Sequence, residues 1–154
     1  MTSLCCKVLK ALQGKTLVTA ESCTGGGIGA ALTQIPGSSE VYKGGVICYT
    51  DWVKANVLGV DKELLSRCGA VSEPVAGQMA LGVRKLLGAD VAVSVTGLAG
   101  PGGDDFGNPV GTVYIGLSWG ENTIVQKFQF DGDRASVRTK SVEAALRMVL
   151  DTIR

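Results

Sequence analysis

The chain has 154 residues, of which 45% are hydrophobic and 19% charged, and its formal net charge is +1. This balance excludes intrinsic disorder, and the length fits a single globular domain over residues 1–154. No basic run indicates a nucleic-acid partner, and no apolar run approaches the roughly 20 residues that span a membrane. The N-terminus shows no secretory signal. Five cysteines, an odd number without paired spacing, indicate reduced thiols and a cytoplasmic protein.

Histidine is absent from the sequence. Its absence excludes the Ser-His-Asp triad, the Cys-His dyad and every metal site that needs histidine. The cysteines include no CxxC-like pair, so a zinc site made of cysteines alone is not expected. We expect no metal and no other cofactor. Any catalytic base must therefore be a carboxylate, a lysine, a tyrosine or a water molecule.

Helices and strands are expected to alternate through the first half of the chain, on the evidence of apolar spacing and turn residues. In chain order they are a helix from Ser3 to Gly14, a strand over residues 16–20, a helix from residue 28 to the turn at 36–39, a strand over 41–49, and a short helix from its expected N-cap, Asp51, to Gly59.

The second half continues this alternation and adds a hairpin. In order we expect a helix from Ser72 to Gly88, an apolar strand over residues 91–96, a glycine-rich loop over 97–109, hairpin strands over 110–118 and 123–130, and a last helix capped by Asp133. This order predicts an α/β three-layer sandwich, with a mixed and mostly parallel sheet between helices.

The sequence TAESCTGGGIG, residues 19–29, joins the first strand to the second helix. Ser22 stands at the bend, and the glycines allow a ligand to approach the backbone closely. A strand–turn–helix with a serine at its bend can present a nucleophile beside backbone N–H donors. The alternative is a capped helix start without chemistry. Cys23 is a second candidate nucleophile, although we favour a buried packing role for it.

Because histidine is missing, a lysine is the natural partner for Ser22. The residues Ser22, Tyr49, Lys54 and Thr96 all fall at or just beyond expected strand ends, where ligands of open α/β sheets bind. A lysine that is partly removed from water has a lowered pKa and can serve as a base. Taken alone, Lys54 would be interpreted as a solvated surface residue.

Two arginines, Arg134 and Arg138, share one face at the start of the last helix, where positive charge opposes the helix dipole. We expect an anion to offset this charge, either a carboxylate such as that of Asp133 or a substrate phosphate. A weaker signal is the dinucleotide-like pattern Gly25-x-Gly27-x-x-Ala30, which would indicate a small NAD-binding protein.

Several motifs together resemble the C-terminal domain of the CinA (competence-damage-inducible) family. They are TAESCTGG from residue 19, PGSS from 36, GGV from 44, Tyr49 with Lys54, GAVS from 69, TGLAGPGG from 96, PVG from 109, and GDR from 132. The resemblance covers nearly the whole chain. It implies a three-layer α/β fold and a form without the extra N-terminal domain of full-length relatives.

The resemblance also implies hydrolysis of the carboxamide of nicotinamide mononucleotide (NMN), giving nicotinic acid mononucleotide and ammonia. The implied catalytic residues are Ser22, Lys54 and Tyr49, with Tyr49 orienting or relaying the proton. Substrate-binding residues would be Glu21, Thr24, Gly25, Gly26, Thr96, Gly97, Gly100, Gly102, Arg134 and Arg138. We also expect a homo-oligomer.

One departure from the family pattern concerns the residues before the lysine. Thr50 and Asp51 stand where relatives often have serine and asparagine. A carboxylate close to Lys54 would keep its amine protonated and weaken it as a base. The alternative function is accordingly a non-catalytic nucleotide-binding module of the same family, with a regulatory role.

Overall fold

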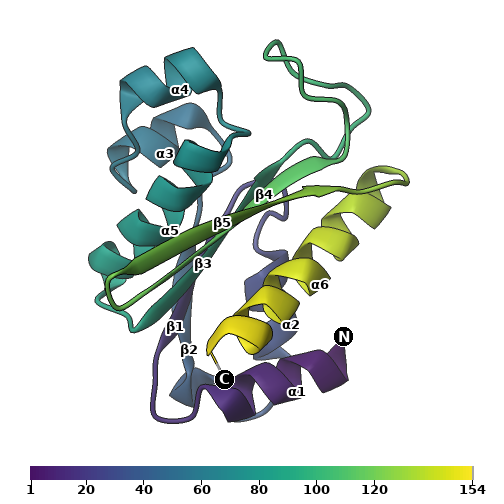
Figure 1. The fold of residues 1–154 in the computed structure, drawn as a ribbon. Helices are drawn as coiled ribbons and strands as arrows, with labels where there is room; N and C mark the ends of the chain where they lie inside the picture. The colour runs from purple at the N-terminus through teal and green to yellow at the C-terminus, as the bar shows by residue number, and fades with distance from the viewer. Residues whose placement is uncertain (154) are drawn as a thin grey trace.

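The structure, a computed structural model, describes residues 1–153 and contains a five-stranded sheet in the order β2-β1-β3-β4-β5 (Figure 1). The first three strands of the chain are parallel to one another: β1 (Leu17–Glu21), β2 (Tyr42–Ile47) and β3 (Val91–Gly97). The last two extend the sheet as an antiparallel hairpin: β4 (Thr112–Trp119) and β5 (Asn122–Gln129). The expected mixed sheet and the hairpin are confirmed, with two parallel and two antiparallel strand pairs.

Helices cover both faces of this sheet, as expected for three layers (Figure 1). One face carries α1 (Thr2–Ala11), α2 (Gly27–Thr33) and α6 (Arg134–Ile153). The other carries α3 (Asp51–Asn56), α4 (Lys62–Cys68) and α5 (Glu73–Leu87), and a single 3₁₀ turn, η1 (Ser38–Glu40), leads into β2. No helix within residues 1–153 is long and apolar enough to cross a membrane.

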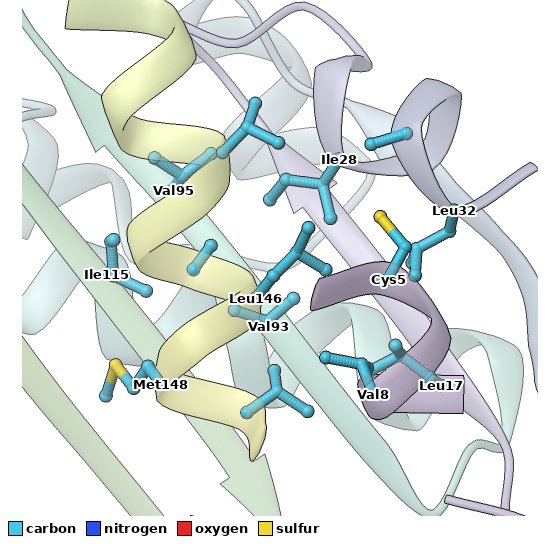
Figure 2. Packing of buried hydrophobic residues seen from close by; sticks show 14 of the residues in the cluster. Cys5, Val8, Leu17, Ile28, Leu32, Val93, Val95, Ile115, Leu146 and Met148 are labelled. Atoms are coloured by element: carbon cyan, nitrogen blue, oxygen red, sulfur yellow. The ribbon is translucent and has the colours of Figure 1, made fainter. Parts of the chain in front are cut away.

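Two apolar clusters hold the layers together. In the larger one, Ile28 and Leu146 pack with Val93 between helices and sheet (Figure 2). The smaller one joins the opposite face of β1, through Val18 and Ala20, to α5. Because β1 is buried on both faces, its side chains need no polar alternation, which explains its continuous apolar run.

The parallel strands place their carboxyl ends at one edge of the sheet. In the ladder, Glu21 at the end of β1 stands opposite Ile47 of β2 and Val95 of β3. Residues that follow these positions therefore meet at the same edge. The long loop between β3 and β4 projects past this edge (Figure 1).

Some element ends differ from the sequence prediction. The first helix begins at Thr2, so Ser3 lies inside it and does not cap it. Helix α4 was not predicted; Asp61 caps it by accepting the Glu63 N–H at 2.8 Å. The expected cap at Asp133 is confirmed, since its carboxylate accepts the Ser136 N–H at 2.8 Å.

The contact between α5 and β4 gives a stability test. A Cβ added at Gly116 would lie 2.6 Å from the carbonyl oxygen of Ala76 and 2.6 Å from Ser94 Oγ. Gly116→Ala should therefore lower the free energy of unfolding by about 1–3 kcal/mol, the usual range for overpacking. Urea denaturation measures this change.

The matched control is Gly77→Ala on α5, where the nearest atom would lie 3.5 Å away at ordinary contact distance. This helical glycine should tolerate alanine, with unchanged stability or a gain of up to about 1 kcal/mol. An equal loss in the free energy of unfolding in the two variants would contradict close packing at Gly116.

Candidate active site

A cleft of about 340 Å³ lies at the carboxyl ends of the parallel strands. Its lining comes from the turn after β1, the start of α3, the segment before α5, the loop after β3 and the start of α6: Ser22, Cys23, Tyr49, Asp51, Lys54, Ala70, Val71, Thr96, Gly97, Leu98, Ala99, Gly100, Gly102 and Arg134. This is where open α/β sheets bind ligands. A second hollow, of about 310 Å³ over Phe128 and Phe130, contains no comparable pair of nucleophile and base.

Lys54 and Ser22 are in hydrogen-bond contact within this cleft. Lys54 Nζ donates to Ser22 Oγ at 3.1 Å and to the Cys48 carbonyl oxygen at 2.9 Å. The lysine side chain is only 2% exposed. The ion pairs within residues 1–153 are two surface pairs on α4 and α6, so no carboxylate holds the ammonium of Lys54. Burial lowers the pKa of Lys54 below its ordinary value of 10.5, which favours the neutral amine that a base requires.

Asp51 does not cap α3 as expected. The N-cap is Thr50, whose extended backbone is typical of that position and whose hydroxyl accepts the Val53 N–H at 3.5 Å. Asp51 is the first helical residue and lines the cleft. Its charge raises the pKa of Lys54, against the larger and opposite effect of burial.

The turn after β1 buries Cys23 and leaves backbone donors free. Burial raises the pKa of the Cys23 thiol to about 11, in agreement with the packing role favoured for it. The Gly25 N–H donates to the Ser22 carbonyl oxygen at 3.1 Å. Among the hydrogen bonds formed within residues 1–153, none uses the N–H of Cys23 or of Thr24. These two amides are candidates for an oxyanion site beside Ser22.

The two arginines of α6 have different surroundings. Arg134 lines the cleft and donates to the Gly100 carbonyl oxygen at 2.7 Å and to the Tyr49 hydroxyl at 3.2 Å. Arg138 instead donates to two carbonyl oxygens of the turn, those of Cys23 at 3.1 Å and Thr24 at 3.2 Å. Neither forms an ion pair within the described residues, so the carboxylate partner considered for them is not found.

The structure thus brings together only part of the expected site. The residues that line the cleft are Ser22, Tyr49, Lys54, Thr96, Gly97, Gly100, Gly102 and Arg134. The residues that do not are Glu21, Thr24, Gly25, Gly26 and Arg138. The Tyr49 side chain is 59% exposed, and its hydroxyl bonds to Arg134, not to Lys54.

Sequence reasoning missed the apolar wall formed by Ala70 and Val71. The hydroxyl of Thr96 donates to the Ala70 carbonyl oxygen at 2.9 Å and so fixes this segment over the strand ends. The segment precedes the proline-marked start of α5, a signal that could have placed it. The Cys48 carbonyl that holds Lys54 was also missed, because a backbone oxygen leaves no trace in the sequence.

Comparison with known proteins places this α/β chain in a family. The family model described as the CinA C-terminal domain matches residues 1–153, and the chain belongs to the CinA family. A CinA superfamily crystal structure from Klebsiella pneumoniae superposes with a TM-score of 0.96 at 36% identity, covering 99% of this chain and 96% of that one. The competence/damage inducible protein CihA of Agrobacterium tumefaciens gives a TM-score of 0.93 at 39% identity, covering 97% and 93%.

Curated relatives are considerably longer than this chain. A CinA-like protein of Synechocystis is 56% identical over 106 residues, which are 69% of this chain and 26% of the relative. A putative competence-damage inducible protein of Bacillus pumilus is 44% identical over 155 residues, covering 99% of this chain and 37% of the relative. The matched part of the chain therefore spans about a quarter of the first relative and somewhat more than a third of the second.

The surroundings of the cysteines predict their reactivity. At pH 8, a thiol of pKa about 11, as for Cys23 and Cys48, is ionised to only about one part in a thousand, and both are buried. A disulfide reagent such as DTNB should modify exposed Cys6 in the native protein and spare Cys23 and Cys48. Peptide mass mapping identifies the labelled residues, with the denatured protein as the control in which all five react. Labelling of Cys23 as fast as Cys6 would contradict the burial of the turn.

Proposed function

We propose that the chain is a metal-independent amidohydrolase that converts NMN to nicotinic acid mononucleotide and ammonia. The observation that carries the proposal is the 3.1 Å contact between Ser22 Oγ and the buried amine of Lys54. A serine needs an adjacent base to become a nucleophile, and this chain has no histidine to provide one. The substrate is suggested by the resemblance to the CinA family.

The reaction would proceed through an acyl-enzyme. Ser22 Oγ attacks the carboxamide carbon while the neutral amine of Lys54 takes the hydroxyl proton. Lys54 then returns a proton to the departing ammonia, and an activated water hydrolyses the ester on Ser22. The Cys48 carbonyl, 2.9 Å from Lys54 Nζ, holds the amine in place through these transfers.

Other groups in the cleft and in the turn beside it suit binding and charge stabilisation. The unused N–H groups of Cys23 and Thr24 would donate to the oxyanion that forms on the carboxamide oxygen. Arg134 would bind the 5′-phosphate in place of its present carbonyl and hydroxyl partners. Tyr49 would orient the substrate, and the loop with Gly100 and Gly102 would close over it.

The second candidate is a nucleotide-binding module without catalysis. The observation in its favour is Asp51, whose carboxylate lines the cleft and raises the pKa of Lys54. A lysine that stays protonated cannot act as a base. Both candidates bind NMN, but only the enzyme releases ammonia.

Ammonia release from NMN by the purified protein is the direct test. Ser22→Ala should remove nearly all turnover while NMN binding persists, because only the nucleophile is lost. Cys23→Ala, the neighbouring control, should keep most activity. An active Ser22→Ala enzyme with a dead Cys23→Ala enzyme would make cysteine the nucleophile, and binding without ammonia release would favour the second candidate.

The pH dependence of kcat tests the role of Lys54. Since burial lowers the pKa of Lys54 and only the neutral amine acts as a base, kcat should rise with pH along one limb centred below 10.5. Asp51→Asn removes a charge that raises this pKa, so the limb should move slightly toward lower pH. Lys54→Arg should be nearly inactive, because arginine keeps its proton. Near-normal turnover of Lys54→Arg would remove the lysine from the mechanism.

Steady-state kinetics with two substrates test Arg134. Arg134→Ala should raise KM for NMN about tenfold or more, the effect of losing a charged hydrogen bond worth roughly 1.5–3 kcal/mol. KM for nicotinamide riboside, which has no phosphate, should change little. Arg138→Ala is the matched arginine outside the cleft and should not produce this difference between substrates. Equal losses on both substrates in Arg134→Ala would argue against phosphate binding.

A further inference from the structure

Glu21, the residue before the nucleophile, is a buried carboxylate that binds the turn and the helix after it. Its side chain is 2% exposed. One oxygen, Oε1, accepts the Thr24 hydroxyl at 2.8 Å and the Ile28 N–H at 2.7 Å. The other, Oε2, accepts the Gly29 N–H at 3.1 Å and the Thr19 hydroxyl at 3.2 Å. The two ion pairs within residues 1–153 do not include it.

Burial of a carboxylate without a cation is unfavourable unless hydrogen bonds compensate for the lost water. Here two of the four compensating hydrogen bonds come from α2. The N-cap of that helix is Gly26, which has no side chain to accept the free N–H groups. Glu21 accepts two of them from the end of β1, and the positive end of the helix dipole favours its charge.

Both ends of the turn are therefore fixed by one residue. The backbone of Glu21 is held in the sheet, where its carbonyl oxygen accepts the Cys48 N–H at 2.9 Å. Its carboxylate is held on α2 and, through Thr24, on the turn itself. Cys48 also supplies the carbonyl that holds Lys54 Nζ, so nucleophile and base are positioned from adjacent points.

We propose that Glu21 is a positioning residue for the hydrolysis described above: its carboxylate fixes the turn so that Ser22 Oγ stays within reach of Lys54 Nζ. The inference rests on the proposed function. Glu21 does not line the cleft, and each of its oxygens already accepts two hydrogen bonds, so it has no place for substrate. Its effect should therefore fall on kcat and not on KM.

Two isosteric variants separate positioning from general stabilisation. Thr24→Val and Thr19→Val each remove one hydroxyl bond to the same carboxylate, and both threonines are buried, at 2% and 1% exposure. Thr19→Val also removes the 2.8 Å bond to the Tyr42 hydroxyl, so it is the more severe of the two changes in number of bonds lost. Thr24 belongs to the turn, whereas Thr19 lies in β1, which the ladder already fixes on both sides. A merely structural role for Glu21 predicts similar results for the two variants.

The measurements are kcat and KM for NMN, with circular dichroism to verify folding. Thr24→Val should lower kcat about tenfold or more with KM within about twofold, because small displacements of a reacting group have large effects on rate. Thr19→Val should keep both constants within about twofold. Equal effects in the two variants, or a rise in KM for Thr24→Val, would overturn the proposal. Glu21→Gln, where it folds, should lower kcat at least as much as Thr24→Val does.

Labelling of Ser22 by a fluorophosphonate separates this proposal from the function on which it rests. The probe reports nucleophilicity at Ser22 without NMN. If the wild-type chain is labelled but releases no ammonia, the proposed substrate fails. Slower labelling in Thr24→Val but not in Thr19→Val would then still support the role of Glu21, and equal labelling rates would overturn it.

Discussion

Burial of the Lys54 amine is the constraint on which this site depends. In water a lysine is charged at neutral pH and is a poor base. Here the side chain is removed from solvent and has the Ser22 hydroxyl and the Cys48 carbonyl as its partners, without an ion-paired carboxylate among the described residues. The hydroxyl and the carbonyl can each accept a hydrogen bond from a neutral amine as well as from a charged one. This environment thus makes the charged form of the Lys54 amine less favourable than it is in water, and so brings the neutral form closer to it in free energy.

The fold provides this environment through the meeting of three parallel strand ends. Ser22 follows β1, Cys48 follows β2, and Thr96 lies at the end of β3. Helix α3 returns Lys54 toward β1, while α5 and the segment before it close the other side through Thr96 and Ala70. Apolar clusters on both faces of the sheet keep these ends in register.

The sequence contained enough information for the layer order and for the meeting of Ser22 with Lys54. Buried strands and helix caps leave local patterns, such as the apolar run in β1 and the proline at the start of α5. What the patterns could not predict is which way a side chain points. Glu21, Thr24 and Arg138 were all expected to bind substrate, yet their polar side-chain atoms bind the protein's own backbone and hydroxyls.

The choice between Thr50 and Asp51 as helix cap illustrates the same limit. Both residue types are good N-caps, so only the backbone angles at Thr50 decide between them. The roles of Arg134 and Arg138 likewise depend on which element faces each of them. Spacing along a helix places two residues on one face, but it does not identify what covers that face.

The hydrogen bonds from Arg138 to the turn have a consequence for the order in which the site forms as the chain is synthesised. Ser22 and Lys54, the proposed nucleophile and base, lie within the first 54 residues, whereas the guanidinium that donates to the Cys23 and Thr24 carbonyls comes from α6. A nascent chain that has emerged only through the β4–β5 hairpin already contains Ser22 and Lys54 but lacks Arg138. The turn therefore acquires these two hydrogen bonds only when α6 packs against it.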